Sequence, residues 1–220
     1  LRTDPEALAV RIRNFLHLHG VEVPPGASAA RGDHRDWYAG WPPLAHAPVD
    51  GDVIDAGRGR WRVIETAGHC RGHLCLYDAD RRLLISGDQV LPTISPNVSV
   101  LSSAPDADPL REFLYSIERL RACAPDTLVL PSHGRPFRRL HARLDDLQAH
   151  HLQQLEALRA CCREPQTAFE VLPAMFRRVP RGFHRLLAVG EAVAHLNYLC
   201  GRGDLERRVD ASGVARFVMR

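Results

Sequence analysis

Hydrophobic and polar positions follow two periods along this chain, one typical of helices and one typical of strands. The first segment has the helical period: Leu8, Ile12 and Phe15 are spaced three or four positions apart. They follow a helix start signal at residues 3–6, and Gly20 is suited to close the helix. We therefore predict an N-terminal amphipathic helix.

The next part of the sequence changes from loop-like to strand-like. Residues 21–59 are rich in Pro, Gly and Ala and show no period, so we predict a long loop. Short apolar runs with β-branched residues follow at residues 61–66, 74–77 and 83–85, with a polar turn at residues 77–81. These runs predict a β-meander.

Helical and strand patterns alternate further along the chain. Asp108 and Pro109 begin a segment with apolar residues at helical spacing, which is followed by a buried strand at residues 127–130. A long helix is expected over residues 140–162. This alternation is typical of a layered α/β core.

The pattern changes again near residue 165. Residues 167–170 form a capping-box sequence, a second helix is expected over residues 186–199, and two β segments flank a turn at residues 210–213. Two helices followed by a hairpin outline a small winged helix. We therefore divide the chain into a main domain, residues 1–164, and a winged-helix-like subdomain, residues 165–220.

Composition and charge narrow the class of protein. Hydrophobic residues make up 45% and charged residues 25%, the balance of a globular domain, and no apolar run is long enough to span a bilayer. The net charge is only +3 and the basic residues are spread along the chain, which disfavours a nucleic-acid partner. We expect a cytoplasmic protein with no membrane partner.

The cysteines do not suggest a disulfide framework. They contain no Cys-x-x-Cys pair, so we expect reduced, mostly buried thiols. Cys70 differs from the others because it follows a candidate metal ligand, His69.

Three polar residues share one local design, an apolar strand followed by a turn that contains glycine. His69, Asp88 and His133 each stand in such a turn. Strand ends deliver side chains to one rim of a sheet, and imidazole nitrogen with carboxylate oxygen suits Zn²⁺, and also Fe or Mn. Taken singly, each residue is more often a surface or turn residue. Together, in this order, they predict a metal site.

These motifs resemble a known family. The run Gly-His-Cys-Arg-Gly-His at residues 68–73, Ser-Gly-Asp at 86–88 and Pro-Ser-His-Gly at 131–134 are similar to the second half of the metallo-β-lactamase superfamily signature. The similarity is strongest to hydroxyacylglutathione hydrolases and related ester and thioester hydrolases with a C-terminal winged helix. It implies an αββα sandwich, incomplete at its N-terminus.

The resemblance also implies a role for each residue. His69 matches the third ligand of the first metal, and His133 matches the last ligand of the second. Asp88 matches the carboxylate that bridges the two metals, which makes it the catalytic residue. His73 matches a histidine that orients the ligand loop by hydrogen bonds. An equally good interpretation of His73 is a buried residue that opens a strand.

The first half of the family signature, His-x-His-x-Asp-His, is missing from this sequence. His17 and His19 have the His-x-His spacing, but Gly20-Val21 follows where Asp-His belongs, and residues 34–36 fit no better. We expect the motif to lie upstream of Leu1. The chain alone should then be impaired in activity.

The resemblance implies a metal-dependent hydrolase of a small ester, thioester or related acyl substrate, acting through metal-bound hydroxide with one or two zinc ions. A nuclease or phosphodiesterase of the same superfamily is one alternative, for which the arginines of residues 177–185 would be tested. A degenerate, non-catalytic binding module is another. A homodimer is left open as a partner.

Three further segments have weaker interpretations. Residues 94–98 follow Asp88 closely and are a candidate for the substrate mouth, although an ordinary loop is the simpler interpretation. Ser132 lies beside His133 but lacks the Gly-x-Ser-x-Gly context of a nucleophile. His150 and His151 are interpreted as helix-face residues.

Overall fold

The computed structural model describes residues 4–23 and 47–220 of the chain. The predicted first helix is confirmed as α1, Pro5–Leu18. The side chain of Asp4 caps it by accepting a hydrogen bond from the Glu6 amide at 3.0 Å, which satisfies one of the unpaired amides of the first turn. Gly20 follows the helix with a φ of +82°, a backbone conformation that favours glycine.

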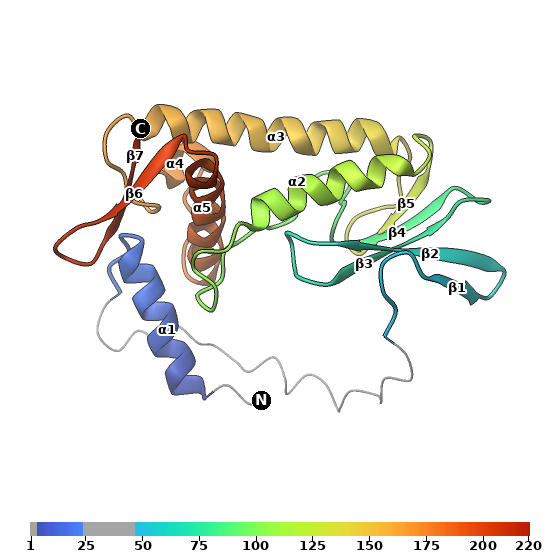
Figure 1. Cartoon of the computed structure of the whole chain (residues 1–220), viewed down its shortest axis with the longest axis horizontal. Coiled ribbons are helices and arrows are strands. Elements are labelled where there is room, and N and C mark those ends of the chain that lie inside the picture. The colour runs from blue at the N-terminus through green and yellow to red at the C-terminus, as the bar shows by residue number, and fades with distance from the viewer. Residues whose placement is uncertain (1–3, 24–46) are drawn as a thin grey trace.

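A five-stranded sheet forms one end of the molecule, and its strands follow in sequence order across the sheet (Figure 1). The first four strands are paired antiparallel, which confirms the predicted meander, and the last pair is parallel. The strands are β1 (Val53–Ala56), β2 (Gly59–Thr66), β3 (His73–Asp78), β4 (Leu83–Gly87) and β5 (Leu128–Pro131).

The loop prediction is wrong at β1. This strand lies at the edge of the sheet and pairs with β2 through a hairpin whose turn contains Gly57, with a φ of +62°. Three of its four residues are exposed. An edge strand with so little burial has no alternation of apolar and polar residues, which is why the sequence did not reveal it.

Helix α2 (Pro109–Arg119) makes the crossover between the parallel strands β4 and β5, as the alternating pattern predicts. Asp108 caps it through the Arg111 amide at 3.1 Å. Its apolar face is buried, and it packs against β2 and a C-terminal helix. A short 3₁₀ turn, Leu120–Ala122, follows before β5.

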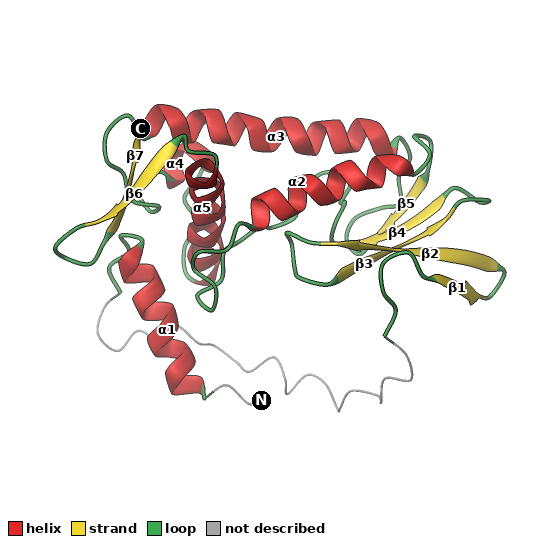
Figure 2. Ribbon diagram, viewed as in Figure 1, coloured by secondary structure: helices red, strands yellow, loops and turns green. Residues whose placement is uncertain are grey.

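The C-terminal part is joined to the sheet end by a long helix, α3 (Leu140–Cys161), which runs along the molecule (Figures 1 and 2). The hydrogen bonds of the predicted capping box form: the Thr167 amide donates to Glu170 at 2.7 Å, and the Glu170 amide donates to the Thr167 hydroxyl at 3.1 Å. They close a turn and do not cap a helix, because α4 begins only at Leu172 and has no side-chain cap. The remaining elements are α4 (Leu172–Met175), α5 (Phe183–Gly201), β6 (Leu205–Val209) and β7 (Ala215–Met219).

Two helices and a hairpin thus occur in the predicted order, while the assignment as a winged helix stays a prediction. Helix α1 packs on this part, since the Phe169 amide donates to the His19 carbonyl at 3.1 Å. One cluster of buried apolar residues runs from Phe15 to Phe217 and includes the sheet, so both parts share a core. The boundary at residue 165 also stays a prediction. Within the described residues, no helix is both long and apolar enough to cross a membrane.

A close approach at the end of β2 gives a first testable prediction. Gly68 has a φ of +108°, and a Cβ there would lie 2.3 Å from Cβ of Phe113 on α2. We expect Gly68→Ala to lower the free energy of unfolding by about 3 kcal/mol or more, from backbone strain and collision together. Urea unfolding followed by circular dichroism measures this.

Gly57→Ala is the matched control for this substitution. Gly57 also has a positive φ, but a Cβ there meets nothing within 4 Å, so only the backbone strain of about 1–2 kcal/mol applies. Equal losses in the two variants would contradict the predicted collision with Phe113.

Candidate metal centre

The direction of the strands brings the three candidate ligands together. Strands β2 and β4 both pair antiparallel with β3 and therefore run the same way, and β5 runs parallel to β4. His69, Asp88 and His133 follow the C-terminal ends of these three strands, which lie on the same side of the sheet.

Asp88 lies between the two histidines. His69 Nε2 is 3.5 Å from one oxygen of Asp88, and His133 Nε2 is 3.5 Å from the other. Two donors bound to one tetrahedral zinc ion at about 2.1 Å lie about 3.4 Å apart. Each histidine and its facing oxygen therefore have the spacing of two ligands of one ion.

The arrangement consists of two donor pairs that share one carboxylate. Within the described part of the chain, no group of three or more His, Cys, Asp or Glu side chains is placed to hold one metal ion. A carboxylate that offers a different oxygen to each histidine suits a bridge between two positions. Each position then has two donors, which is half of a tetrahedral shell.

The hydrogen bond of His69 fixes which ring nitrogen is available. His69 Nδ1 lies 2.9 Å from the backbone carbonyl of Asn97. A carbonyl oxygen only accepts, so Nδ1 carries the proton and, in the neutral ring, Nε2 turns a lone pair toward Asp88. A lone pair and a carboxylate repel unless a cation lies between them. The donor chemistry therefore fits a divalent metal such as zinc.

Asp88 is itself held by a neighbour on the next strand. The Ser132 amide donates to the Gly87 carbonyl at 3.1 Å, and the Ser132 hydroxyl donates to the Asp88 carboxylate. The Ser132 hydroxyl therefore supports the Asp88 carboxylate. His133 is the most open member, with 72% of its side chain exposed.

His73 packs behind the site. Its Nδ1 lies 2.9 Å from the Thr66 hydroxyl, and a Cβ at Gly87 would lie only 2.5 Å from its Nε2. Desolvation lowers the pKa of His73, repulsion from a charged His69 adds to this, and Asp88 opposes it. The ring contacts the backbone that carries Asp88, and its role in orienting the ligand loop stays a prediction.

All six cysteines are free thiols, as expected, and Cys70 is exposed. Partial burial and the negative charge of Asp88 raise the pKa of the Cys70 thiol. The thiol is then mostly protonated at neutral pH, which makes it a poor nucleophile.

Residues 94–98, the candidate substrate mouth, contact the C-terminal helices instead of remaining a free loop. The Ser95 hydroxyl lies 3.2 Å from Nε2 of His151 on α3, and the Asn97 amide donates to Glu191 of α5 at 3.3 Å. His151 in turn lies 3.1 Å from His195 of α5. These contacts connect the C-terminal helices to the segment that holds His69.

His151 lies on a helix face, as interpreted from the sequence, and this face of α3 is buried, with the His151 ring fully enclosed. Burial is the main cause that lowers the pKa of His151 to about 2 and that of His195 to about 4, so both rings are neutral hydrogen-bonding groups at neutral pH. Glu191 and His195 are not among the site residues predicted from the sequence. The available signal was two ionisable residues in the otherwise apolar run of residues 188–196.

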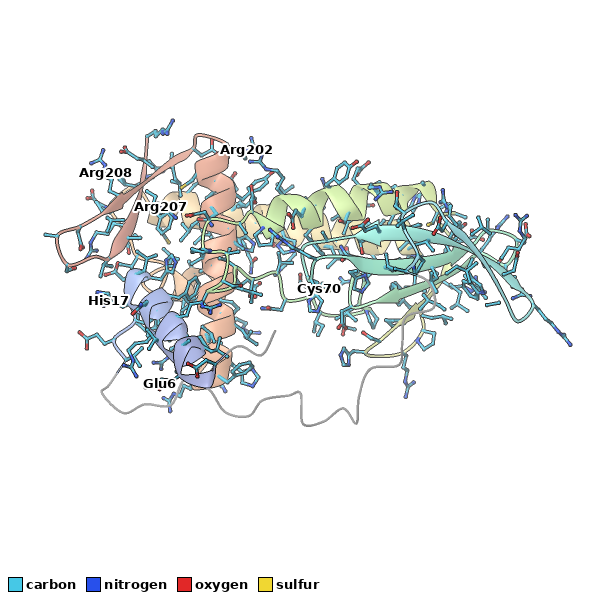
Figure 3. All side chains as sticks on the ribbon, turned by 60° about the horizontal axis from the view of Figure 1, so that its bottom comes forward. Glu6, His17, Cys70, Arg202, Arg207 and Arg208 are labelled. Atoms are coloured by element: carbon cyan, nitrogen blue, oxygen red, sulfur yellow. The ribbon has the colours of Figure 1, made fainter. Side chains whose placement is uncertain are left out.

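His17 and His19 take no part in the site. His17 lies beside the C-terminal hairpin, where its Nε2 is 3.0 Å from the Ser212 carbonyl, and Figure 3 shows it on a different part of the molecule from Cys70. His19 is fully buried and packs edge-on against Phe15. Residues 34–36 lie outside the described residues.

The mixed sheet, with two histidines and an aspartate gathered at one edge, defines an α/β protein with a metal-type ligand set. A sequence profile of the metallo-beta-lactamase superfamily matches residues 12–133, more than half of the chain. The chain therefore belongs to the metallo-beta-lactamase superfamily. A second profile, the metallo-beta-lactamase-like C-terminal domain, matches residues 155–220.

Solved structures agree with this assignment. A beta-lactamase domain protein from Burkholderia ambifaria superposes with a TM-score of 0.86 at 38% identity, covering 97% of this chain and 61% of that one. A metallo-beta-lactamase family protein from Thermus thermophilus has a TM-score of 0.76 at 29% identity, covering 99% and 66%. The chain thus matches about two thirds or less of either protein.

Curated relatives match shorter parts. Acyl-coenzyme A thioesterase MBLAC2 of Homo sapiens is 51% identical over 41 residues, which cover 19% of this chain and 15% of the relative. Hydroxyacylglutathione hydrolase of Cereibacter sphaeroides is 28% identical over 120 residues, covering 53% and 44%. The chain spans less than half the length of either relative.

The buried acid gives a second prediction. Burial raises the pKa of the Glu191 carboxyl from 4.5 to about 7, although the Asn97 amide opposes the rise. The folded protein therefore binds this proton more tightly than the unfolded chain, and stability falls as the pH rises from 4.5 to about 7. Glutamine cannot ionise, so Glu191→Gln does not undergo this fall in stability. We expect the gain in unfolding free energy of Glu191→Gln over wild type to be about 2 kcal/mol larger at about pH 8 than at about pH 5.

Urea unfolding of both proteins at the two pH values measures this difference. The buried histidines are present in both proteins, so their titration cancels in the comparison. Glu156→Gln, which removes an exposed acid of α3, is the control for the loss of one negative charge. A stabilisation by Glu191→Gln that is the same at both pH values would contradict the prediction.

Proposed function

We propose that this chain carries part of the active site of a metal-dependent hydrolase that acts on a small ester, thioester or related acyl compound. The observation that carries the proposal is the position of Asp88, with one oxygen facing His69 and the other facing His133 at 3.5 Å. The similarity to an acyl-coenzyme A thioesterase and to a hydroxyacylglutathione hydrolase supports an acyl substrate.

Zinc is the metal that we propose, with iron or manganese as alternatives. His69 would hold the first ion, His133 the second, and Asp88 both, since imidazole and carboxylate suit these metals. When bound, such an ion is a Lewis acid that polarises the acyl carbonyl and activates water. The hydrogen bond to the Asn97 carbonyl orients the His69 ring, and the hydrogen bond from Ser132 orients the Asp88 carboxylate, so that both would face the ion.

The three candidate ligands are too few for two tightly bound ions. Two donors for each ion are fewer than the three protein ligands that are usual in catalytic zinc sites. Additional donors beyond these three residues are therefore needed for tight binding of two ions and for full turnover. We propose a cytoplasmic protein that acts on a small molecule, and a homodimer stays a prediction.

The nuclease alternative has less support from the described residues. Of the arginines at residues 177–185, Arg185 lies over the ring of Phe169 at 5.7 Å and donates to the Pro180 carbonyl at 3.5 Å. An arginine used in this way is less available to a phosphate. The non-catalytic module is separated from the enzyme by the two measurements that follow.

Zinc binding to the purified chain tests the ligand set. We expect weak zinc binding. His69→Ala or His133→Ala should lower the zinc affinity at least about tenfold, because the loss of a residue that only supports a ligand already lowers metal affinity by about that factor. Asp88→Asn should have the largest effect, since Asp88 faces both histidines. Competition with a chromophoric zinc indicator measures this.

His184→Ala is the control for these variants, because His184 is an exposed histidine at the start of α5. Its zinc affinity should equal that of the unchanged chain. Wild-type affinity in Asp88→Asn would refute the proposed site.

Hydrolysis by the zinc-loaded chain tests the reaction. We expect slow hydrolysis of a small thioester, below the roughly 1–10³ s⁻¹ of typical enzymes, and its loss in Asp88→Asn. Faster cleavage of an activated phosphodiester would favour the nuclease. Zinc binding with neither reaction would favour the binding module, and full thioester turnover would contradict the predicted shortage of ligands.

A further inference from the structure

We propose that Glu191 of α5 is a positioning residue for the metal ligand His69 and acts on it through Asn97. The inference rests on the proposed function, because it takes His69 as a ligand. We also propose that, in the protein without metal, Glu191 determines which nitrogen of His69 carries the proton.

One residue, Asn97, connects the two side chains. Its backbone carbonyl faces His69 Nδ1 at 2.9 Å, and its side-chain amide donates to Glu191 Oε2 at 3.3 Å. Its side-chain oxygen accepts a hydrogen bond from the Ser99 hydroxyl at 2.8 Å. Both ends of the Asn97 amide group are therefore held, and the direction of its backbone carbonyl is fixed with them.

The segment around Asn97 is attached to α5 along its length. The Val100 amide donates to the Gly190 carbonyl at 3.0 Å. The Ser99 hydroxyl also lies 3.0 Å from the Leu187 carbonyl, which shares the single hydrogen of this hydroxyl with the Asn97 side-chain oxygen. A Cβ at Gly190 would lie 2.7 Å from the Val100 carbonyl oxygen, so the absence of a side chain permits this close contact. A shift of α5 at this point would move the support of His69.

Ser95 connects the same segment to α3 and α5 through a chain of hydrogen bonds. Each donor in this chain can be assigned. His195 Nδ1 lies 2.8 Å from the Glu191 carbonyl and must donate to it, so its Nε2 accepts from His151 Nδ1 at 3.1 Å. The remaining nitrogen of His151 then accepts from the Ser95 hydroxyl at 3.2 Å, in competition with the Pro96 carbonyl 3.3 Å from the same hydroxyl. Neutral rings held in fixed tautomers keep the segment in one position.

The burial of Glu191 is difficult to explain without such a role. Only 9% of the residue is exposed, and a buried acid reduces stability unless it is well paired. The partner that its side chain has among the described residues is the amide of Asn97. Ionisable groups that are buried at a cost in stability are often found at functional sites.

The chemistry of the contact predicts how two substitutions differ. Glutamine keeps an oxygen that accepts from the Asn97 amide, whereas alanine leaves that amide without its acceptor. Glu191→Gln should therefore preserve the position of His69, and Glu191→Ala should release it. A role in packing alone would make the two variants differ only in stability.

The experiment measures zinc affinity and the protonation of the His69 ring in the full chain. We expect Glu191→Ala to lower zinc affinity about 10- to 100-fold and Glu191→Gln to stay within about threefold of the unchanged protein. In the zinc-free protein, ¹⁵N NMR should find the His69 proton on Nδ1 for wild type and Glu191→Gln. A mixture of both tautomers is expected for Glu191→Ala.

Val193→Ala is the matched control, because Val193 is a fully buried residue of the same helix outside this network. The substitution should lower stability but leave zinc affinity and the His69 tautomer unchanged. An equal loss of affinity in Val193→Ala, or wild-type affinity and tautomer in Glu191→Ala, would overturn the positioning role.

The outcome for Glu191 can be separated from the outcome for the proposed function. If the unchanged chain binds no zinc, the proposed metal site fails, and the tautomer measurement alone decides the role of Glu191. If zinc binds but Glu191→Ala changes neither readout, the metal site stands and the positioning role fails.

Discussion

Strands β2, β4 and β5 share one direction, and the rest of the site depends on this constraint. Antiparallel pairing through β3 makes β2 and β4 run alike, and the α2 crossover makes β5 follow β4. The ends of all three strands therefore meet at one edge of the sheet. Without the parallel pair, His133 would leave the sheet at the opposite edge from Asp88, and no carboxylate would lie between the two imidazoles.

The polar groups at this edge are arranged around negative charge. Asp88 faces His69 and His133, accepts a hydrogen bond from the Ser132 hydroxyl and still has about a third of its side chain exposed. A neutral imidazole that turns its lone pair toward a carboxylate is unfavourable in isolation and becomes favourable around a cation. Deeper in the protein, burial raises the pKa of the Glu191 carboxyl, whose hydrogen-bond partner among the described residues is the Asn97 amide.

Much of the fold was predictable from the sequence because its signals are local. The helical spacing in α1 and the Asp108 cap of α2 depend on neighbouring residues and are confirmed. The capping-box hydrogen bonds at Thr167 also form, although the helix expected there begins only at Leu172. Strand β1 was missed because an exposed edge strand lacks alternation. The three candidate ligands stood in recognisable turns, whereas the support from Asn97 and Glu191 joins residues 94 positions apart. No local pattern encodes such a pair.

The connection between α5 and His69 also bears on how the two matched segments of the family relate. The two profiles cover residues 12–133 and 155–220, which suggests two modules. The buried apolar cluster nevertheless runs through both, and the support of His69 comes from a helix of the second. If His69 is a metal ligand, as we propose, the C-terminal segment would be a structural part of that site, because α5 holds the residue that contacts His69.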